Sequence, residues 1–93
     1  MLEQYEQALE EWIGAIVEQG DDDQLFASGY LQGHFAVVLS QLEVETEQGQ
    51  QALESKMAAC LDTAKTELEP ADFQLVLAAW HELSGKISAS VAA

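Results

Sequence analysis

Apolar residues recur at intervals of three and four positions along four stretches of the chain, and strand-like alternation is missing throughout. This spacing puts apolar side chains on one face of an α-helix. The pattern predicts helices over residues 2–19, 23–46, 51–67 and 70–88. Four amphipathic helices joined by short loops predict an all-α, single-domain, antiparallel up-and-down four-helix bundle spanning residues 1–93.

Residues at the predicted helix ends agree with these boundaries. Gly20 follows the first helix at a C′ position, where glycine is free to adopt a positive φ. Gly49 is the expected turn before the third helix. Pro70 suits the first position of the last helix, because its missing N–H costs nothing there. Asp72 in the same first turn interacts favourably with the helix dipole.

Each predicted helix has an apolar stripe that we expect to face a shared core. In chain order, the stripes contain Leu2, Tyr5, Leu9, Trp12, Ile13 and Ile16; Leu31, Phe35, Val38 and Leu42; Leu53, Met57, Cys60, Leu61 and Ala64; and Phe73, Val76, Leu77, Trp80, Leu83 and Ile87. Cys60 is the only cysteine. No basic neighbour in sequence would lower its thiol pKa, so we predict a small buried hydrophobe rather than a nucleophile.

The stretch DDDQLFASGYLQGHF, residues 21–35, opens the second predicted helix with three aspartates. We predict that Asp21, Asp22 and Asp23 form its helix cap, because a carboxylate accepts a hydrogen bond from a free N–H of the first turn. Negative charge there also interacts well with the helix dipole. A calcium loop of the EF-hand type needs glutamate at its twelfth position, which here is Gln32. We therefore expect no metal at this stretch.

Two glycines interrupt the same helix, although each costs about 1 kcal/mol relative to alanine in a helix interior. One narrow face, opposite the apolar stripe, contains Gly29, Gly33, Ala36 and Ser40. A helix with so little polar surface is usually buried nearly all round. We therefore expect another backbone to approach this face closely, either from a helix of the same chain or from a second copy in a homodimer.

His34 projects beside Tyr30, four residues earlier, so their side chains can touch. The simpler interpretation is a partly buried neutral histidine that hydrogen-bonds to a backbone or side-chain acceptor. The alternative is a small-molecule or metal site between helices, centred on His34 and Tyr30. Zinc would need about three more ligands, and neither His81 nor Cys60 has the spacing of a zinc motif.

Apolar residues beside the glycines, with acidic residues around them, are typical of a protein interface with apolar anchors and a polar rim. We predict an interaction face that contains Phe26, Gly29, Tyr30, Gly33 and His34. The function favoured by the sequence is therefore a protein–protein interaction module that acts through the second helix.

The chain has 17 acidic residues, three lysines and no arginine, which gives a formal net charge of −14. Nucleic-acid phosphates and anionic membranes need lysine or arginine, so we expect neither as a partner. The charge either keeps the protein dispersed or matches a basic protein partner. The N-terminus lacks the features of a signal peptide, which predicts a cytoplasmic location. We find no signature of an enzyme, and we expect no catalytic residue and no cofactor.

Residues 21–34, DDDQLFASGYLQGH, resemble the signature of the YfcL family of small bacterial proteins. The later stretch PADFQLVLAAW is similar less specifically, through Pro70, Asp72, Leu75, Val76 and Trp80. The chain departs from the family pattern at Gln24, where an acid is expected, and at Gln32, where a basic residue is expected. The resemblance implies a short helical bacterial protein, with the second helix as the shared part, and implies no particular activity.

Overall fold

The computed structural model describes residues 2–92, which form four helices and contain no strand. These are α1 (Leu2–Gln19), α2 (Asp22–Glu43), α3 (Gln50–Glu67) and α4 (Pro70–Ala92). The predicted all-α bundle is confirmed. Helix α2 ends three residues earlier than expected, and α4 continues four residues further. Over the described residues, no helix combines the length and the apolar composition that crossing a bilayer requires.

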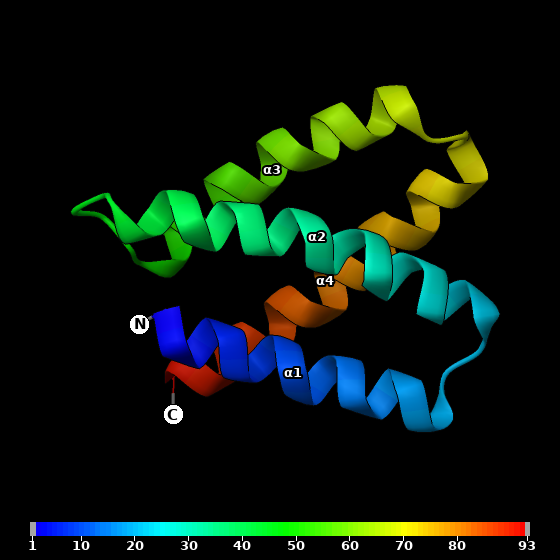
Figure 1. Cartoon of the computed structure of the whole chain (residues 1–93), viewed down its shortest axis with the longest axis horizontal. Coiled ribbons are helices and arrows are strands. Elements are labelled where there is room, and N and C mark those ends of the chain that lie inside the picture. Colours follow the sequence, from blue (N-terminus) through cyan, green and yellow to red (C-terminus); the bar gives the residue numbers. More distant parts are fainter. Residues whose placement is uncertain (1, 93) are drawn as a thin grey trace.

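Helix α2 lies between α1 and α3, and α4 crosses behind it (Figure 1). Successive helices run in opposite directions. Helix α2 packs against each of the other three helices, whereas α1 and α3 make no contact with each other within residues 2–92. Three sides of α2 are therefore covered by the chain itself, and one side faces outward.

Helix α2 begins at a capping box, which explains the sharp turn from α1. The Asp21 carboxylate accepts a hydrogen bond from the backbone N–H of Gln24 at 2.9 Å, and the Gln24 side-chain oxygen accepts one from the Asp21 N–H at 3.1 Å. This reciprocal pair satisfies two otherwise free donors. Asp22 and Asp23 lie in the first helical turn and add negative charge near the positive end of the helix dipole.

Gly20 is required in this turn for a reason that differs from the predicted one. No described glycine adopts a positive φ. A Cβ at Gly20 would instead lie 2.6 Å from the carbonyl oxygen of Ile16, which accepts a hydrogen bond from the Gly20 N–H. The close approach of two backbone segments, rather than a left-handed conformation, explains the glycine.

The core lies where the four apolar stripes meet. Most stripe residues are buried as predicted, and those that are only half-buried are Leu2, Ile13, Cys60, Leu61, Phe73 and Leu77. The ring of Phe35 on α2 lies 6.4 Å, centroid to centroid, from that of Trp80 on α4. The indole N–H of Trp12 donates a hydrogen bond to Glu82 at 3.0 Å, which joins α1 to α4.

The loop between α2 and α3 is attached to the core through Gln48. The buried Tyr5 hydroxyl donates a hydrogen bond to the Gln48 carbonyl oxygen at 2.9 Å. The Gln48 side-chain amide donates to the carbonyl oxygens of Leu42 and Glu45, at 2.9 and 3.2 Å. The Leu42 carbonyl also accepts the backbone N–H of Glu45 at 3.1 Å, so the loop just after α2 is held against the end of that helix.

Candidate interaction surface

One side of α2 is not covered by any other helix of the chain. We call it the outer face and define it by residues at helical spacing that are all exposed: Phe26, Gly29, Gly33, Val37 and Ser40. Phe26 is 40% exposed and Val37 is 54% exposed. The structure thus brings the glycines of the predicted interaction face together with two large apolar side chains at the surface.

The two glycines of the outer face meet no neighbour. A Cβ built at Gly29 or Gly33 has nothing within 4 Å outside its own helical surroundings. The expected close approach by another helix of the same chain is therefore wrong for the described residues. The reason is topological, since α4 covers the large apolar stripe of α2 while α1 and α3 lie at its flanks. The homodimer alternative stays a prediction.

Because these glycines have open space around them, alanine at both positions is expected to stabilise the fold. The double substitution Gly29→Ala and Gly33→Ala should raise the free energy of unfolding by about 1 kcal/mol per site, since alanine is the better helix former. Denaturant titration followed by circular dichroism measures this. Gly20→Ala is the contrasting control, because its Cβ would collide with the Ile16 carbonyl. A destabilised double variant would show that the outer face is already packed.

Tyr30 and His34 lie at the edge of the outer face that borders α3. Their rings are 4.9 Å apart, which agrees with the predicted contact, and the Phe26 ring lies 6.4 Å from that of Tyr30. The Tyr30 hydroxyl is buried and has no hydrogen-bond partner among the described residues. Burial raises the pKa of Tyr30, and the nearby Glu67 and Cys60 raise it further. His34 itself is half-buried, as expected.

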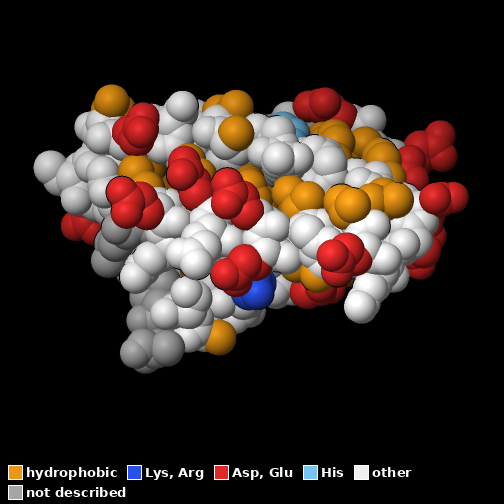
Figure 2. All heavy atoms as spheres, turned by 60° about the horizontal axis from the view of Figure 1, so that its bottom comes forward, with side chains coloured by type: hydrophobic (Ala, Val, Ile, Leu, Met, Phe, Trp, Pro, Cys, Tyr) orange, Lys and Arg blue, Asp and Glu red, His pale blue; other side chains and the backbone are white. Residues whose placement is uncertain are grey.

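The surface of the protein carries many acidic side chains and few basic ones. Figure 2 shows acids spread over one side of the molecule, with apolar side chains between them. Within residues 2–92 two ion pairs form, between Lys56 and Glu45 at 2.6 Å and between Lys86 and Glu11 at 3.4 Å. With three lysines in all, most carboxylates in the described range have no cationic partner.

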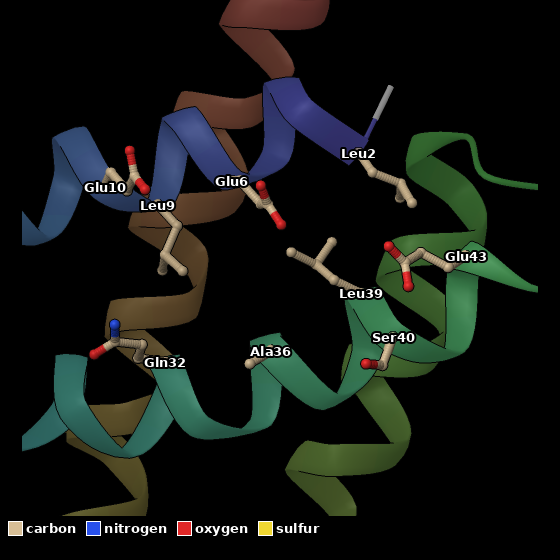
Figure 3. A pocket seen from close by; sticks show the side chains of 9 residues that line it. All are labelled: Leu2, Glu6, Leu9, Glu10, Gln32, Ala36, Leu39, Ser40 and Glu43. Carbon is tan, nitrogen blue, oxygen red and sulfur yellow. The ribbon is translucent and has the colours of Figure 1, made fainter.

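A groove of about 350 Å³ runs between α1 and α2, along the side of the outer face opposite to Tyr30. Its lining residues are Leu2, Glu6, Leu9, Glu10, Gln32, Ala36, Leu39, Ser40 and Glu43. In Figure 3, Glu6 and Glu43 extend from the two helices toward the space between them, and Leu39 points into it. Ser40 belongs to both the outer face and this groove, so the two form one continuous surface.

Comparison with known proteins matches residues 3–85 to the YfcL protein family. The chain belongs to the YfcL family. A protein of Escherichia coli (strain K12), described as the uncharacterized protein YfcL, is 34% identical over 85 residues, which cover 89% of this chain and 92% of that protein. No solved structure matches the chain. The family predicted from the resemblance is thereby confirmed.

In this YfcL-family protein the region around Tyr30 and His34 is closely packed. The space that these two residues share with Cys60, Met57 and Val76 does not admit a water molecule. A shallow groove beside it exposes His34 and Cys60. Burial raises the pKa of the Cys60 thiol, which keeps the thiol protonated and weakly nucleophilic. The described residues therefore leave no enclosed space beside Tyr30 that a small molecule could occupy.

The groove between α1 and α2 was not predicted from the sequence. Glu6 and Glu10 share one side of α1, but nothing in the order of residues places them opposite Glu43. The only available signal was the row of small residues that ends in Ala36 and Ser40, which leaves space beside α2. The lining residues on the two helices come together only through the packing of α1 on α2.

Proposed function

We propose that this YfcL-family protein is a protein–protein interaction module and that its partner covers the outer face of α2. The observation that carries the proposal is the pair of glycines in open space. Each costs about 1 kcal/mol of helix stability, and no contact within the described chain uses the room that they leave. A second backbone lying against α2 would use it.

The apolar residues of the outer face support the same proposal. Phe26 and Val37 lie on either side of Gly33 and retain much of their surface in contact with water. Because these side chains are already partly buried, covering the rest of their surface would contribute roughly half of the about 1.5–3 kcal/mol that full burial of an exposed side chain gives. Apolar anchors surrounded by polar residues are the usual layout of protein interfaces. We infer no catalytic role, because the surface holds no arrangement of nucleophile and base.

Charge and cysteine content support a protein partner and a cytoplasmic location for the module. Nucleic acid and anionic membranes would require cations that three lysines, two of them paired with glutamates, do not provide. A small domain with a single cysteine, and hence without an intrachain disulfide, suits a reducing compartment.

Site-specific photo-crosslinking in the native cell tests the proposal. A benzophenone amino acid would replace Val37 on the outer face in one variant and Val17, a similarly exposed valine of α1, in the matched control. We expect a defined crosslinked species from position 37 and none of that mass from position 17. Its mass distinguishes a second copy of the chain from another protein.

A second substitution tests whether the crosslink depends on close packing of the partner against the glycines of α2. Gly33→Leu in the Val37 variant should abolish the crosslinked species, because the added side chain fills the space over α2. Gly14→Leu, at an exposed glycine of α1 that also has nothing within 4 Å, is the matched control and should leave it unchanged. Equal crosslinking by both leucine variants would exclude the outer face as the contact surface.

A further inference from the structure

The groove between α1 and α2 combines an apolar floor with an acidic rim. Its floor contains Leu2, Leu9, Ala36 and Leu39, and its rim carries the carboxylates of Glu6, Glu10 and Glu43. Figure 3 labels the side chains of all these residues. A ligand that fills this groove must therefore present an apolar body to the floor and positive charge to the rim.

Among residues 2–92, none of the rim carboxylates forms an ion pair with a lysine. The ion pairs of the described chain involve Glu45 and Glu11, which do not line the groove. No group of three or more metal-ligating side chains in residues 2–92 is arranged to hold a metal ion, so the three glutamates are too dispersed to share one. Separate carboxylates along a groove instead suit cationic groups carried on a longer molecule.

We propose that the groove receives lysine or arginine side chains from an amphipathic helix of the protein partner, and that this helix lies across the outer face of α2. The inference rests on the proposed function and adds the chemistry of the partner. The aliphatic stem of a lysine or arginine packs on apolar surface while its charged end reaches polar groups at the rim. Leu39 offers the apolar surface, and Glu43, one turn further along α2, offers a carboxylate.

The geometry of α2 favours a helix as the element that carries these cations. Gly29 and Gly33 are one turn apart and leave room for a backbone to approach. Ser40 joins that approach path to the groove. A partner helix over the glycines can place apolar residues against Phe26 and Val37 and basic residues, three or four positions away, into the groove.

A synthetic helical peptide with leucine on one face and lysine along its edge is the probe. Its binding to the full-length, ¹⁵N-labelled protein is followed by amide shifts in NMR. We expect shifts at Ala36, Leu39 and Ser40. The triple variant Glu6→Gln, Glu10→Gln, Glu43→Gln should weaken binding by about tenfold or more, because each carboxylate removed is a charge partner of the peptide.

Non-specific attraction to an acidic protein is controlled by a variant of equal net charge. Glu18→Gln, Asp62→Asn and Glu69→Gln remove three exposed carboxylates that do not line the groove. This control should bind the peptide nearly as tightly as the unmodified chain. Equal weakening in both triple variants would overturn the inference, since overall charge would then explain the binding. Spermidine is tested separately as a small cation that is not a helix. Binding of spermidine to the groove as tight as that of the peptide would overturn the inference.

The variants also separate this inference from the proposed function. Peptide binding that Gly33→Leu abolishes but the groove glutamates do not affect would leave the outer face as a contact surface and overturn the groove proposal alone. Peptide binding that neither change affects would overturn both. Loss of binding in the groove variant and in Gly33→Leu, with retention in the charge control, is the result that supports both.

Discussion

Replacing Phe35 by alanine is expected to destabilise the protein by about 3–5 kcal/mol, the largest effect of any single change considered for this fold. Phe35 has no exposed surface, and its ring packs beside that of Trp80, so its loss opens a cavity between α2 and α4. Small domains are typically stable by about 5–15 kcal/mol. The Phe35→Ala variant should therefore be close to unfolded at moderate temperature.

Denaturant titration of Phe35→Ala and Val37→Ala, followed by circular dichroism, measures this difference. Val37 lies on the same helix but is more than half exposed, so its truncation should change the free energy of unfolding by no more than about 0.5 kcal/mol. Similar losses in the two variants would mean that α2 does not bury the stripe described above.

Alkaline pH should produce the second effect on stability, through the phenols of Tyr5 and Tyr30 and the thiol of the half-buried Cys60. Burial raises the pKa of the Tyr5 and Tyr30 phenols above 10.0 and that of the Cys60 thiol above 9.0. The unfolded chain therefore loses these protons at lower pH than the folded chain. Their contribution to stability is complete below the unfolded pKa values and is lost as pH rises through the folded ones. When the pH lies between the unfolded-state and folded-state pKa values of one of these groups, each further pH unit lowers the free energy of unfolding by about 1.4 kcal/mol.

Melting temperatures between about pH 8 and about pH 11 measure this loss. Cys60→Ala, Tyr5→Phe and Tyr30→Phe should each make the fall less steep. The two tyrosine variants should also differ in melting temperature at neutral pH. Tyr5→Phe loses a hydrogen bond to the Gln48 carbonyl, whereas Tyr30→Phe removes a buried hydroxyl that has no partner among the described residues. A melting temperature that stays constant up to about pH 11 would contradict the raised pKa values of all three groups.

The buried side of each helix could be predicted because helical periodicity is a property of the chain alone. Leu31, Phe35, Val38 and Leu42 are all buried, as their spacing predicts. The ends of α2 and α4 depend on contacts between distant segments and were misjudged. The Gln48 side chain bonds to carbonyl groups at and just after the end of α2, and the side chains of Gln50 and Ser88 hydrogen-bond to each other near the end of α4. The sequence pattern contains no information about such pairings.

For the candidate surface, too, relations within one helix could be predicted from the sequence and contacts between helices could not. Phe26, Gly29 and Gly33 lie on one face, and Tyr30 touches His34, because both relations follow from positions within a single helix. What lies opposite that face depends on how the other helices pack, and the structure shows that none of them covers it. The groove beside Ala36 is likewise formed by two helices together.

The placement of the two tryptophans gives the protein a built-in optical reporter. Trp12 and Trp80 lie almost wholly buried on α1 and α4, and the outer face of α2 contains no tryptophan. Intrinsic fluorescence emission should therefore shift to longer wavelength when the core opens to water, and should change little when another molecule settles on α2. Unfolding and occupancy can thus be recorded in one unlabelled sample, the first by emission wavelength and the second by hydrodynamic size.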